Sequence, residues 1–142
     1  LATGKTVVRK DLFDWSKEED EQIRYYSGTA VYKATFRWKD KLKKGQPVYL
    51  NLGKVCNLAT VRVNGIDCGT VWTAPYRADI TSALKKGTNE LEIEVTNTWA
   101  NALKGVDEGK APYDGIWTNA KYRKQEDTLL PAGLLGILTI EN

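Results

Sequence analysis

The stretch that decides the fold runs from Ala59 to Asn97 and reads ATVRVNGIDCGTVWTAPYRADITSALKKGTNELEIEVTN. On both sides of Asn64-Gly65, apolar residues alternate with polar ones, which is the pattern of two half-buried strands. Asn-Gly supplies the two positive-φ positions of a type I′ turn, so the dipeptide predicts a two-residue hairpin. The pairs predicted across this hairpin are Val63 with Ile66, Val61 with Cys68 and Ala59 with Thr70. Their apolar members are then expected to share one face.

Further strands are predicted on the same grounds. After the hairpin, Leu91, Ile93 and Val95 alternate with glutamates, which predicts a strand with one buried face and one acidic solvent face. The other predicted extended segments are Thr6 to Val8, Leu12 to Trp15, Thr29 to Trp38, Val48 to Leu52, Tyr76 to Ile80 and Leu134 to Ile140. Ser16 and Glu19 have the spacing of a capping box, which predicts one helical turn through Glu21. The segment from Thr98 to Leu130 is predicted to be irregular.

Seven or eight short strands with almost no helical periodicity predict an all-β fold, an antiparallel β-sandwich of the jelly-roll type. The 142 residues form a single predicted domain, long enough to bury a core without metal or disulfide staples. The residues predicted to point into that core are Tyr32, Phe36, Leu50, Val61, Val63, Leu91 and Ile93.

Composition argues against two classes of partner. The chain has 21 basic and 18 acidic residues, a net charge of +3, and these charges are interspersed, so we expect neither nucleic acid nor an anionic membrane surface. No apolar run approaches the roughly 20 residues of a membrane span. The chain has no Met and opens with LATGKT, without a charged and apolar leader, so we expect it to be an excised or processed piece of something larger.

The sequence also argues against a catalytic or metal site. There is no His, which excludes imidazole bases and His ligands, and two cysteines alone do not make a zinc site, so we expect no metal and no cofactor. Cys56 lies about 16 Å along an extended strand from the residue beside Cys68, so two free thiols are predicted, one of them in the core. Glu90, Glu92 and Glu94 project side by side from one strand, whereas glycoside hydrolysis needs two carboxylates facing each other across a pocket. Asp107, Glu108 and Asp114 could only complete a site that another domain supplies.

If successive strands run antiparallel, several loops meet at one end of the sandwich. These loops are Tyr25 to Ser27, Lys54 to Asn57, Trp72 to Tyr76 and Asn97 to Asn101. The opposite end holds polar turns, including Lys39 to Lys44 and Lys85 to Gly87. Aromatic residues at loop ends either plug the end of a sandwich or form a platform for a sugar ring, and the sequence leaves both possibilities open for Trp72, Tyr76 and Trp99.

Several motifs together resemble a known family. They are YxxTF (Tyr32 to Phe36), VRVNGxxxGxxW (Val61 to Trp72), PYRADIT (Pro75 to Thr81) and KxGTNELEIEVTN (Lys85 to Asn97). Together they resemble the sugar-binding jelly-roll domain of family 2 glycoside hydrolases, one of the galactose-binding-domain-like folds. YYSGTAVY (Tyr25 to Tyr32) and LLPAGLLG (Leu129 to Gly136) look more like the C-terminal copy of such a domain in bacterial β-galactosidase-like and α-L-rhamnosidase-like enzymes.

The resemblance implies a non-catalytic accessory domain of a periplasmic or secreted glycoside hydrolase. Such a domain would bind carbohydrate weakly, pack against the catalytic domain of the same chain, or do both. In a sugar site, the apolar faces would come from Trp72, Tyr76 and Trp99, and the directed hydrogen bonds from Arg77, Asn97 and Asn101. The alternatives are a purely structural interdomain module and a lectin-like module outside any enzyme. Asp79 is expected to brace the turn that starts at Thr81, Trp38 to lie in the core, and Gly69 to mark close packing or a bulge.

Overall fold

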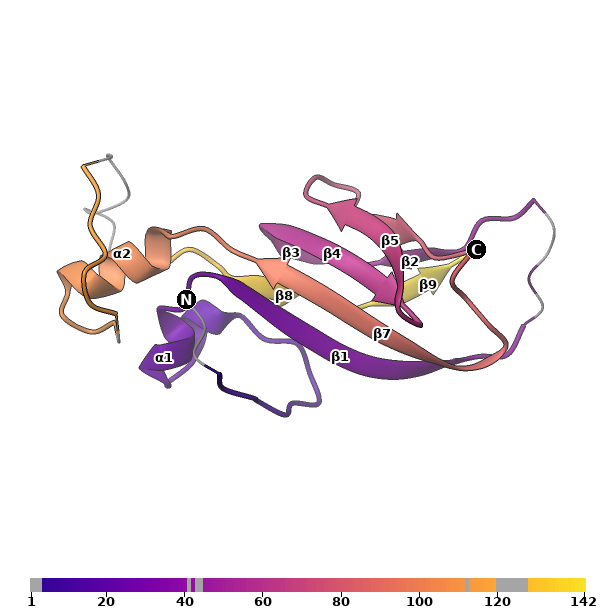
Figure 1. The fold of residues 1–142 in the computed structure, drawn as a ribbon, viewed down its shortest axis with the longest axis horizontal. Coiled ribbons are helices and arrows are strands. Elements are labelled where there is room, and N and C mark those ends of the chain that lie inside the picture. The colour runs from indigo at the N-terminus through magenta and orange to yellow at the C-terminus, as the bar shows by residue number, and fades with distance from the viewer. Residues whose placement is uncertain (1–3, 41, 43–44, 112, 120–127) are drawn as a thin grey trace.

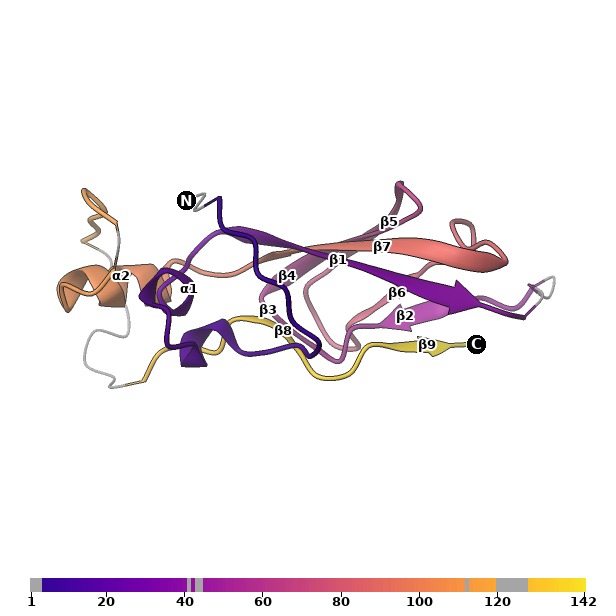
Figure 2. The ribbon, with the colours of Figure 1, turned by 90° about the horizontal axis from the view of Figure 1, so that it is seen from below.

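The computed structural model describes residues 4–40, 42, 45–111, 113–119 and 128–142. Nine strands and three short helices appear in the described residues, and Figures 1 and 2 show two layers of strands with the helices α1 and α2 gathered at one end. The strands are β1 (Thr29–Trp38), β2 (Tyr49–Asn51), β3 (Lys54–Cys56), β4 (Leu58–Val63), β5 (Ile66–Val71), β6 (Arg77–Asp79), β7 (Gly87–Thr96), β8 (Gly133–Leu135) and β9 (Thr139–Glu141). The helices are η1 (Trp15–Lys17), α1 (Glu21–Arg24) and α2 (Ala100–Asp107).

The first layer is a four-stranded sheet with the order β1-β7-β4-β5, and every neighbouring pair in it is antiparallel. The second layer contains a three-stranded sheet with the order β6-β2-β9 and the pair β3-β8. The antiparallel β-sandwich predicted from the strand pattern is therefore confirmed. Because β4 lies between β5 and β7 and directly follows β3 in sequence, the chain crosses from one layer to the other at Asn57.

The hairpin between β4 and β5 forms around Asn64-Gly65, with φ values of 52° and 80° at the two turn residues. Val63 pairs with Ile66 as predicted, but Ala59 pairs with Val71 and not with Thr70. The register shifts because one extra residue on β5 creates a bulge at Gly69, whose φ is 98°. The bulge at Gly69 is thus confirmed, and the predicted pair beyond it, Ala59 with Thr70, was wrong by one residue.

The core lies between the two layers and consists of alternate residues of the predicted strands. Among the predicted inward residues, Leu50, Val61, Val63, Leu91 and Ile93 are buried, while Tyr32 and Phe36 are half-buried and pack against the same cluster. Trp38 also packs there, as expected. Ile66 is 48% exposed because it follows the turn at the end of an edge strand, so the predicted shared face of the hairpin stops short of it.

The N-terminal segment differs from its prediction. The structure has no strand at Thr6 to Val8 or at Leu12 to Trp15. The helical turns begin at other N-caps than the predicted Ser16. The Asp14 carboxylate accepts from Ser16 N–H at the start of η1, and the Asp20 carboxylate accepts from Gln22 N–H at the start of α1. Asp is as good an N-cap as Ser, so the helical turns start after Asp14 and Asp20, and Ser16 does not act as the N-cap.

The segment from Thr98 to Leu130, predicted to be irregular, contains the helix α2. Gly105 lies at the contact of α2 with Tyr25, where a Cβ atom would come within 2.6 Å of the Tyr25 ring. The glycine that weakens the helical signal in the sequence is therefore required by close packing. The predicted final strand from Leu134 to Ile140 is divided into β8 and β9, with Gly136 at a φ of 109° between them.

Candidate functional site

The end of the sandwich at which β5 and β7 finish is called the aromatic end here. It comprises residues 25–28, 54–57, 72–76 and 97–101, which include the strand β3 and the start of α2. Thr96 pairs with Leu58, and Val71 pairs with the adjacent Ala59, so the ends of β7 and β5 flank the start of β4. Strand spacing places these two ends about 10 Å apart. The loops 25–28 and 97–101 and Asn57 meet as predicted, whereas the loop 72–76 follows β5 on the other side of β4 and no hydrogen bond among the described residues joins it to them.

Hydrogen bonds tie three of these loops together. Ser27 Oγ donates to the Thr98 carbonyl at 2.8 Å and accepts from Ala102 N–H at 3.2 Å, which fixes the start of α2 against the loop before β1. Asn57 N–H donates to the Thr96 carbonyl at 3.0 Å. Ser27 is buried, with 1% of its surface exposed, so these contacts form a closed polar network below the surface of the aromatic end.

Asn97 and Asn101, two of the predicted sugar-orienting residues, belong to this buried network. Asn97 Oδ1 accepts from Gly28 N–H at 2.9 Å, and its Nδ2 donates to the Tyr26 carbonyl at 2.8 Å. Asn101 bonds both backbone groups of Leu130, at 2.7 and 2.8 Å. The two side chains are 8% and 3% exposed. Each amide uses its oxygen and its nitrogen within the chain, so both residues brace the loops in this conformation.

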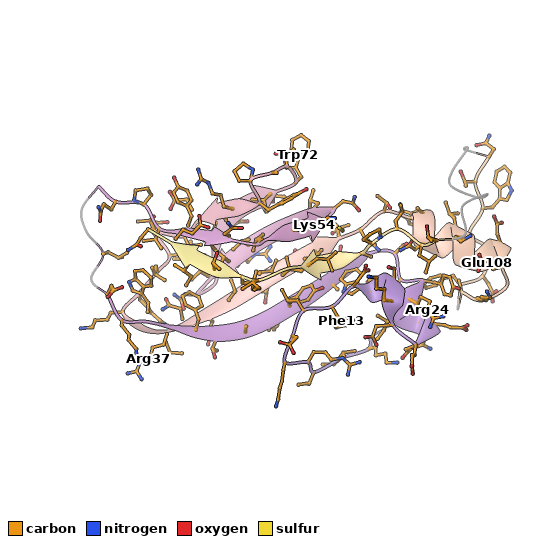
Figure 3. All side chains as sticks on the ribbon, turned by 180° about the vertical axis from the view of Figure 1, so that it is seen from behind. Phe13, Arg24, Arg37, Lys54, Trp72 and Glu108 are labelled. Carbon is orange, nitrogen blue, oxygen red and sulfur yellow. The ribbon has the colours of Figure 1, made fainter. Side chains whose placement is uncertain are left out.

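The tryptophans of the aromatic end are arranged differently. Trp72, in the loop between β5 and β6, is 69% exposed, and Figure 3 shows it projecting from the sandwich about halfway along its length. Trp99 occupies the N-cap position of α2 and is 53% exposed. Neither ring plugs the sandwich. Tyr76 does so in part, because it is half-buried against the core and its carbonyl accepts from Leu52 N–H at 2.7 Å.

Arg77 begins β6 and lies on the second sheet. Its guanidinium carbon is 4.6 Å from the centroid of the Tyr49 ring, a cation–π distance, and the two residues lie on neighbouring strands. Arg77 is exposed, so this contact leaves its donors accessible. The six candidate residues therefore divide into two exposed tryptophans, one exposed arginine stacked on a tyrosine, one half-buried tyrosine and two buried asparagines. Their role in sugar binding stays a prediction.

One exposed aromatic residue was missed. Trp117 is 81% exposed and lies between Ile116 and Thr118 in the segment after α2. The surrounding Asp114, Gly115 and Asn119 give no alternation of apolar and polar residues, and this signal could have identified Trp117 as a surface aromatic.

Two neighbouring lysines stabilise the ionised form of the Glu108 carboxylate. Glu108 lies 2.9 Å from Lys104 Nζ and 3.1 Å from Lys110 Nζ, and these hydrogen bonds lower the pKa of its carboxyl group. A general acid for glycoside cleavage needs a raised pKa, so Glu108 has the opposite electrostatic environment. Asp114 is exposed. On the other sheet, hydrogen bonds from the Thr81 side chain and N–H lower the pKa of Asp79, which confirms its role as a brace of the turn.

Both cysteines are free thiols, as predicted. Cys56 is buried and Cys68 is half-buried, and burial raises the pKa of each thiol. Within the described parts of the chain, no cluster of three or more His, Cys, Asp or Glu side chains is placed to hold a metal ion. None of the described helices is long and apolar enough to cross a membrane.

The architecture defines an all-β domain of the galactose-binding-domain-like class. Comparison with known proteins gives the family: the model of the glycosyl hydrolase 2 galactose-binding domain-like family matches residues 2–128, and the chain belongs to this family. The resemblance that the motifs indicated is therefore confirmed.

Two relatives match most of the chain. A putative beta-glucuronidase of Formosa agariphila is 38% identical over 164 residues, covering 99% of this chain and 14% of the relative. A rhamnosidase structure from Novosphingobium sp. PP1Y is 42% identical with a TM-score of 0.81, covering 89% of this chain and 12% of that one. A Ruminococcus gnavus beta-glucuronidase, 22% identical with a TM-score of 0.51 over 58% of this chain and 14% of its own, shares the fold. The chain thus spans only a small part of each relative.

Proposed function

We propose that this chain is a non-catalytic accessory domain of a larger glycoside hydrolase, periplasmic or secreted, and that its aromatic end packs against the rest of that enzyme. The observation that supports the proposal is the contrast at this end between exposed tryptophans and buried, internally bonded asparagines. Exposed tryptophans are typical anchors of protein interfaces. A sugar site needs directed polar groups beside the aromatic face, and here the amides predicted for that role hold the loops together.

Weak carbohydrate binding is the second candidate, and Trp72 is the observation that favours it. Its ring is the most exposed of the three candidate aromatic side chains, it lies four residues before Tyr76 and five before Arg77, and a flat exposed indole can stack on a sugar ring. Such a shallow site would bind with a Kd of about millimolar to tens of micromolar, because little area is buried.

Replacing Trp72 or Trp99 with Ala is expected to separate the two candidates. If the aromatic end is an interface, each change should weaken the complex between this chain and the separately expressed remainder of its enzyme by about tenfold or more, as for a typical hot-spot residue. Leu42→Ala is the matched control, since Leu42 is 44% exposed in the turn after β1, at the other end of the sandwich. Isothermal titration calorimetry measures the affinities.

The same samples test sugar binding. Titration with galactosides, rhamnosides and glucuronides up to tens of millimolar should leave the Trp fluorescence without a saturable change if the aromatic end only packs against protein. A saturable change that Trp72→Ala abolishes, with no complex between the two pieces, would instead establish the carbohydrate-binding role.

The chain alone is expected to hydrolyse no glycoside. The charged groups beside Glu108 keep it ionised, and Glu90, Glu92 and Glu94 lie in a row along one strand without facing a second carboxylate across a pocket. Incubation with a panel of aryl-glycosides should give the buffer rate. Turnover that disappears on replacing Asp107, Glu108 or Asp114 would contradict this expectation and make the segment after β7 catalytic.

A further inference from the structure

Strand β1 forms one edge of the four-stranded sheet, and its free side is unusually long. All ten residues pair with β7, and no backbone hydrogen bond joins them to any other described segment. The Gly28 carbonyl accepts from Asn97 N–H, just before the first pair of the ladder. In an antiparallel pair, hydrogen-bonded positions alternate, so the even-numbered residues of β1 bond to β7. The odd-numbered residues therefore point their N–H and C=O groups away from the sheet.

Within the described parts of the chain, only one of these outward groups has a hydrogen-bond partner. The Thr29 carbonyl accepts from Tyr26 Oη at 2.8 Å. Beyond it, the backbone groups of Val31, Lys33, Thr35 and Arg37 form a row of donors and acceptors with the spacing of a strand, and all four residues are exposed. Soluble domains rarely leave such an edge open, because it is a template for another strand.

A groove of about 1070 Å³ runs beside this edge. One wall is the first half of β1 and the other is the N-terminal segment, which starts near the beginning of β1 and runs toward the second layer (Figure 2). Its floor is apolar and comes from both layers of the sandwich, including Tyr32, Ile93, Leu134 and Leu138. Ile93 and Leu134 are already buried, whereas Tyr32 and Leu138 are half-buried and Val8 and Ile137 of the walls are exposed, so these four residues supply the apolar surface of the groove. The Tyr32 hydroxyl already accepts from Trp15 Nε1 at 2.8 Å. The exposed face is therefore mainly hydrocarbon.

The rim of the groove is basic. Among the described residues that line it, the charged side chains are Lys5, Arg9, Lys10, Lys33 and Asp11. Lys5 already pairs with Asp20 and Arg9 with Glu18, so the groove meets a new carboxylate mainly through Lys10 and Lys33. Lys33 is 75% exposed and lies 3.4 Å from Glu92, so its ammonium group is largely free to meet a second carboxylate. Arg37, further along the same face of β1, is exposed as well.

We propose that an extended segment of the longer polypeptide, outside residues 1–142, adds to the free edge of β1 as a fifth strand of this sheet. Its alternate residues are apolar and cover the floor of the groove, and the residues between them are acidic and lie beside Lys33 and Arg37. The backbone groups of Val31 to Arg37 give this strand its hydrogen bonds, and the period of two gives it its specificity. The proposal rests on the proposed function, because it requires that the domain belongs to a larger chain, as the relatives do.

Charge favours this occupant over two others. A second copy pairing β1 with β1 in the register centred on Thr35 would place Lys33 opposite Arg37, and like charges destabilise a cross-strand pair. The N-terminal segment of this chain carries Lys5, Arg9 and Lys10 and already forms the far wall of the groove. An acidic and apolar strand is complementary to Lys10 of the far wall and to Lys33 and Arg37 of β1.

Hydrogen exchange of the β1 amides tests the proposal in the wild-type protein. In the 142-residue chain, the amides of Val31, Lys33, Thr35 and Arg37 should exchange near the unprotected rate, and in the full-length enzyme they should exchange at least about 100-fold more slowly. Equally fast exchange in both would overturn the proposal. Slow exchange in the 142-residue chain that becomes concentration-dependent would overturn it too, in favour of a dimer.

Thr35→Pro provides the second arm. Its N–H points outward, so proline is tolerated there in the free edge but blocks an added strand. In the full-length enzyme it should restore fast exchange at Val31, Lys33 and Arg37, while the melting temperature of the 142-residue chain stays unchanged. Ala34→Pro is the matched control, because it removes a bond to β7 and should lower that melting temperature. Thr35→Pro leaves Trp72 and Trp99 intact, so loss of the β1 strand is distinguishable from loss of the interface at the aromatic end.

Discussion

Val63→Asp is expected to unfold the domain at room temperature or leave it only marginally stable. Val63 is 0% exposed on the central strand β4, between β7 and β5, and belongs to the main core cluster. An aspartate there would be either a buried charge without a partner or a carboxyl group that has to be protonated at neutral pH. Either state lowers the free energy of unfolding by about 4–5 kcal/mol. That is a large part of the 5–15 kcal/mol that stabilises a typical domain.

The control for Val63→Asp lies directly across the hairpin. Ile66 pairs with Val63 but is 48% exposed, so an aspartate at Ile66 keeps its hydration. We expect Ile66→Asp to change the free energy of unfolding by about 1 kcal/mol or less. Urea unfolding followed by circular dichroism gives both values. If Val63→Asp lowered the free energy of unfolding as little as Ile66→Asp, Val63 would not face the core and the register of β4 would be wrong.

The long strands could be predicted from the sequence because their burial has the period of the pleat. Residues Leu91, Ile93 and Val95 are each followed by a polar residue, and the structure buries all three on β7. The alternation fixes which face is buried, and a turn as specific as Asn64-Gly65 fixes the pairing next to it. The bulge at Gly69 shifts the pairing of β4 with β5 without changing the composition of the strand. The glycine indicated where a bulge could lie, but the pairing beyond it could not be predicted.

The elements that could not be predicted depend on contacts between distant segments. The helix α2 forms where Gly105 packs closely against Tyr25, and no property of the segment from 98 to 130 alone reveals that contact. Likewise, the sequence placed Asn97 and Asn101 in converging loops, which the structure confirms. It could not show that the side-chain amides of both asparagines hydrogen-bond backbone groups of other loops, because those bonds depend on how the loops pack.

Gly133→Ala is expected to be the most disruptive change that adds a single methyl group. Gly133 opens β8 with a φ of 102°, a left-handed conformation that costs a residue with a Cβ atom about 1–2 kcal/mol. The new Cβ would also lie 2.6 Å from Trp15 Nε1 and 2.7 Å from Trp15 Cε2, well inside van der Waals contact. Overpacking adds about 1–3 kcal/mol, so we expect a total loss of about 3–4 kcal/mol.

The indole of Trp15 has little freedom to move away from that methyl group. It is 4% exposed, its Nε1 donates to Tyr32 Oη, and its ring stacks on Tyr32 with the centroids 6.3 Å apart. The backbone N–H of Trp15 also donates to the Ala132 carbonyl at 3.0 Å, which fixes the residue next to Gly133. The clash must therefore be relieved by shifting β8 or by breaking the Trp15–Tyr32 contact, and both cost stability.

Gly69→Ala separates the two contributions to this loss. Gly69 has a φ of 98° but no atom within 4 Å of the position that a Cβ would take, so alanine there pays only for the backbone conformation. We expect Gly69→Ala to lose about 1–2 kcal/mol in the same denaturation experiment. Trp15→Phe, which removes the pyrrole edge that faces Gly133, should make Gly133→Ala less costly in a double-mutant cycle. If Gly133→Ala and Gly69→Ala lost the same free energy of unfolding, and the double-mutant cycle gave no interaction energy with Trp15, the backbone of β8 would not be in close contact with the indole.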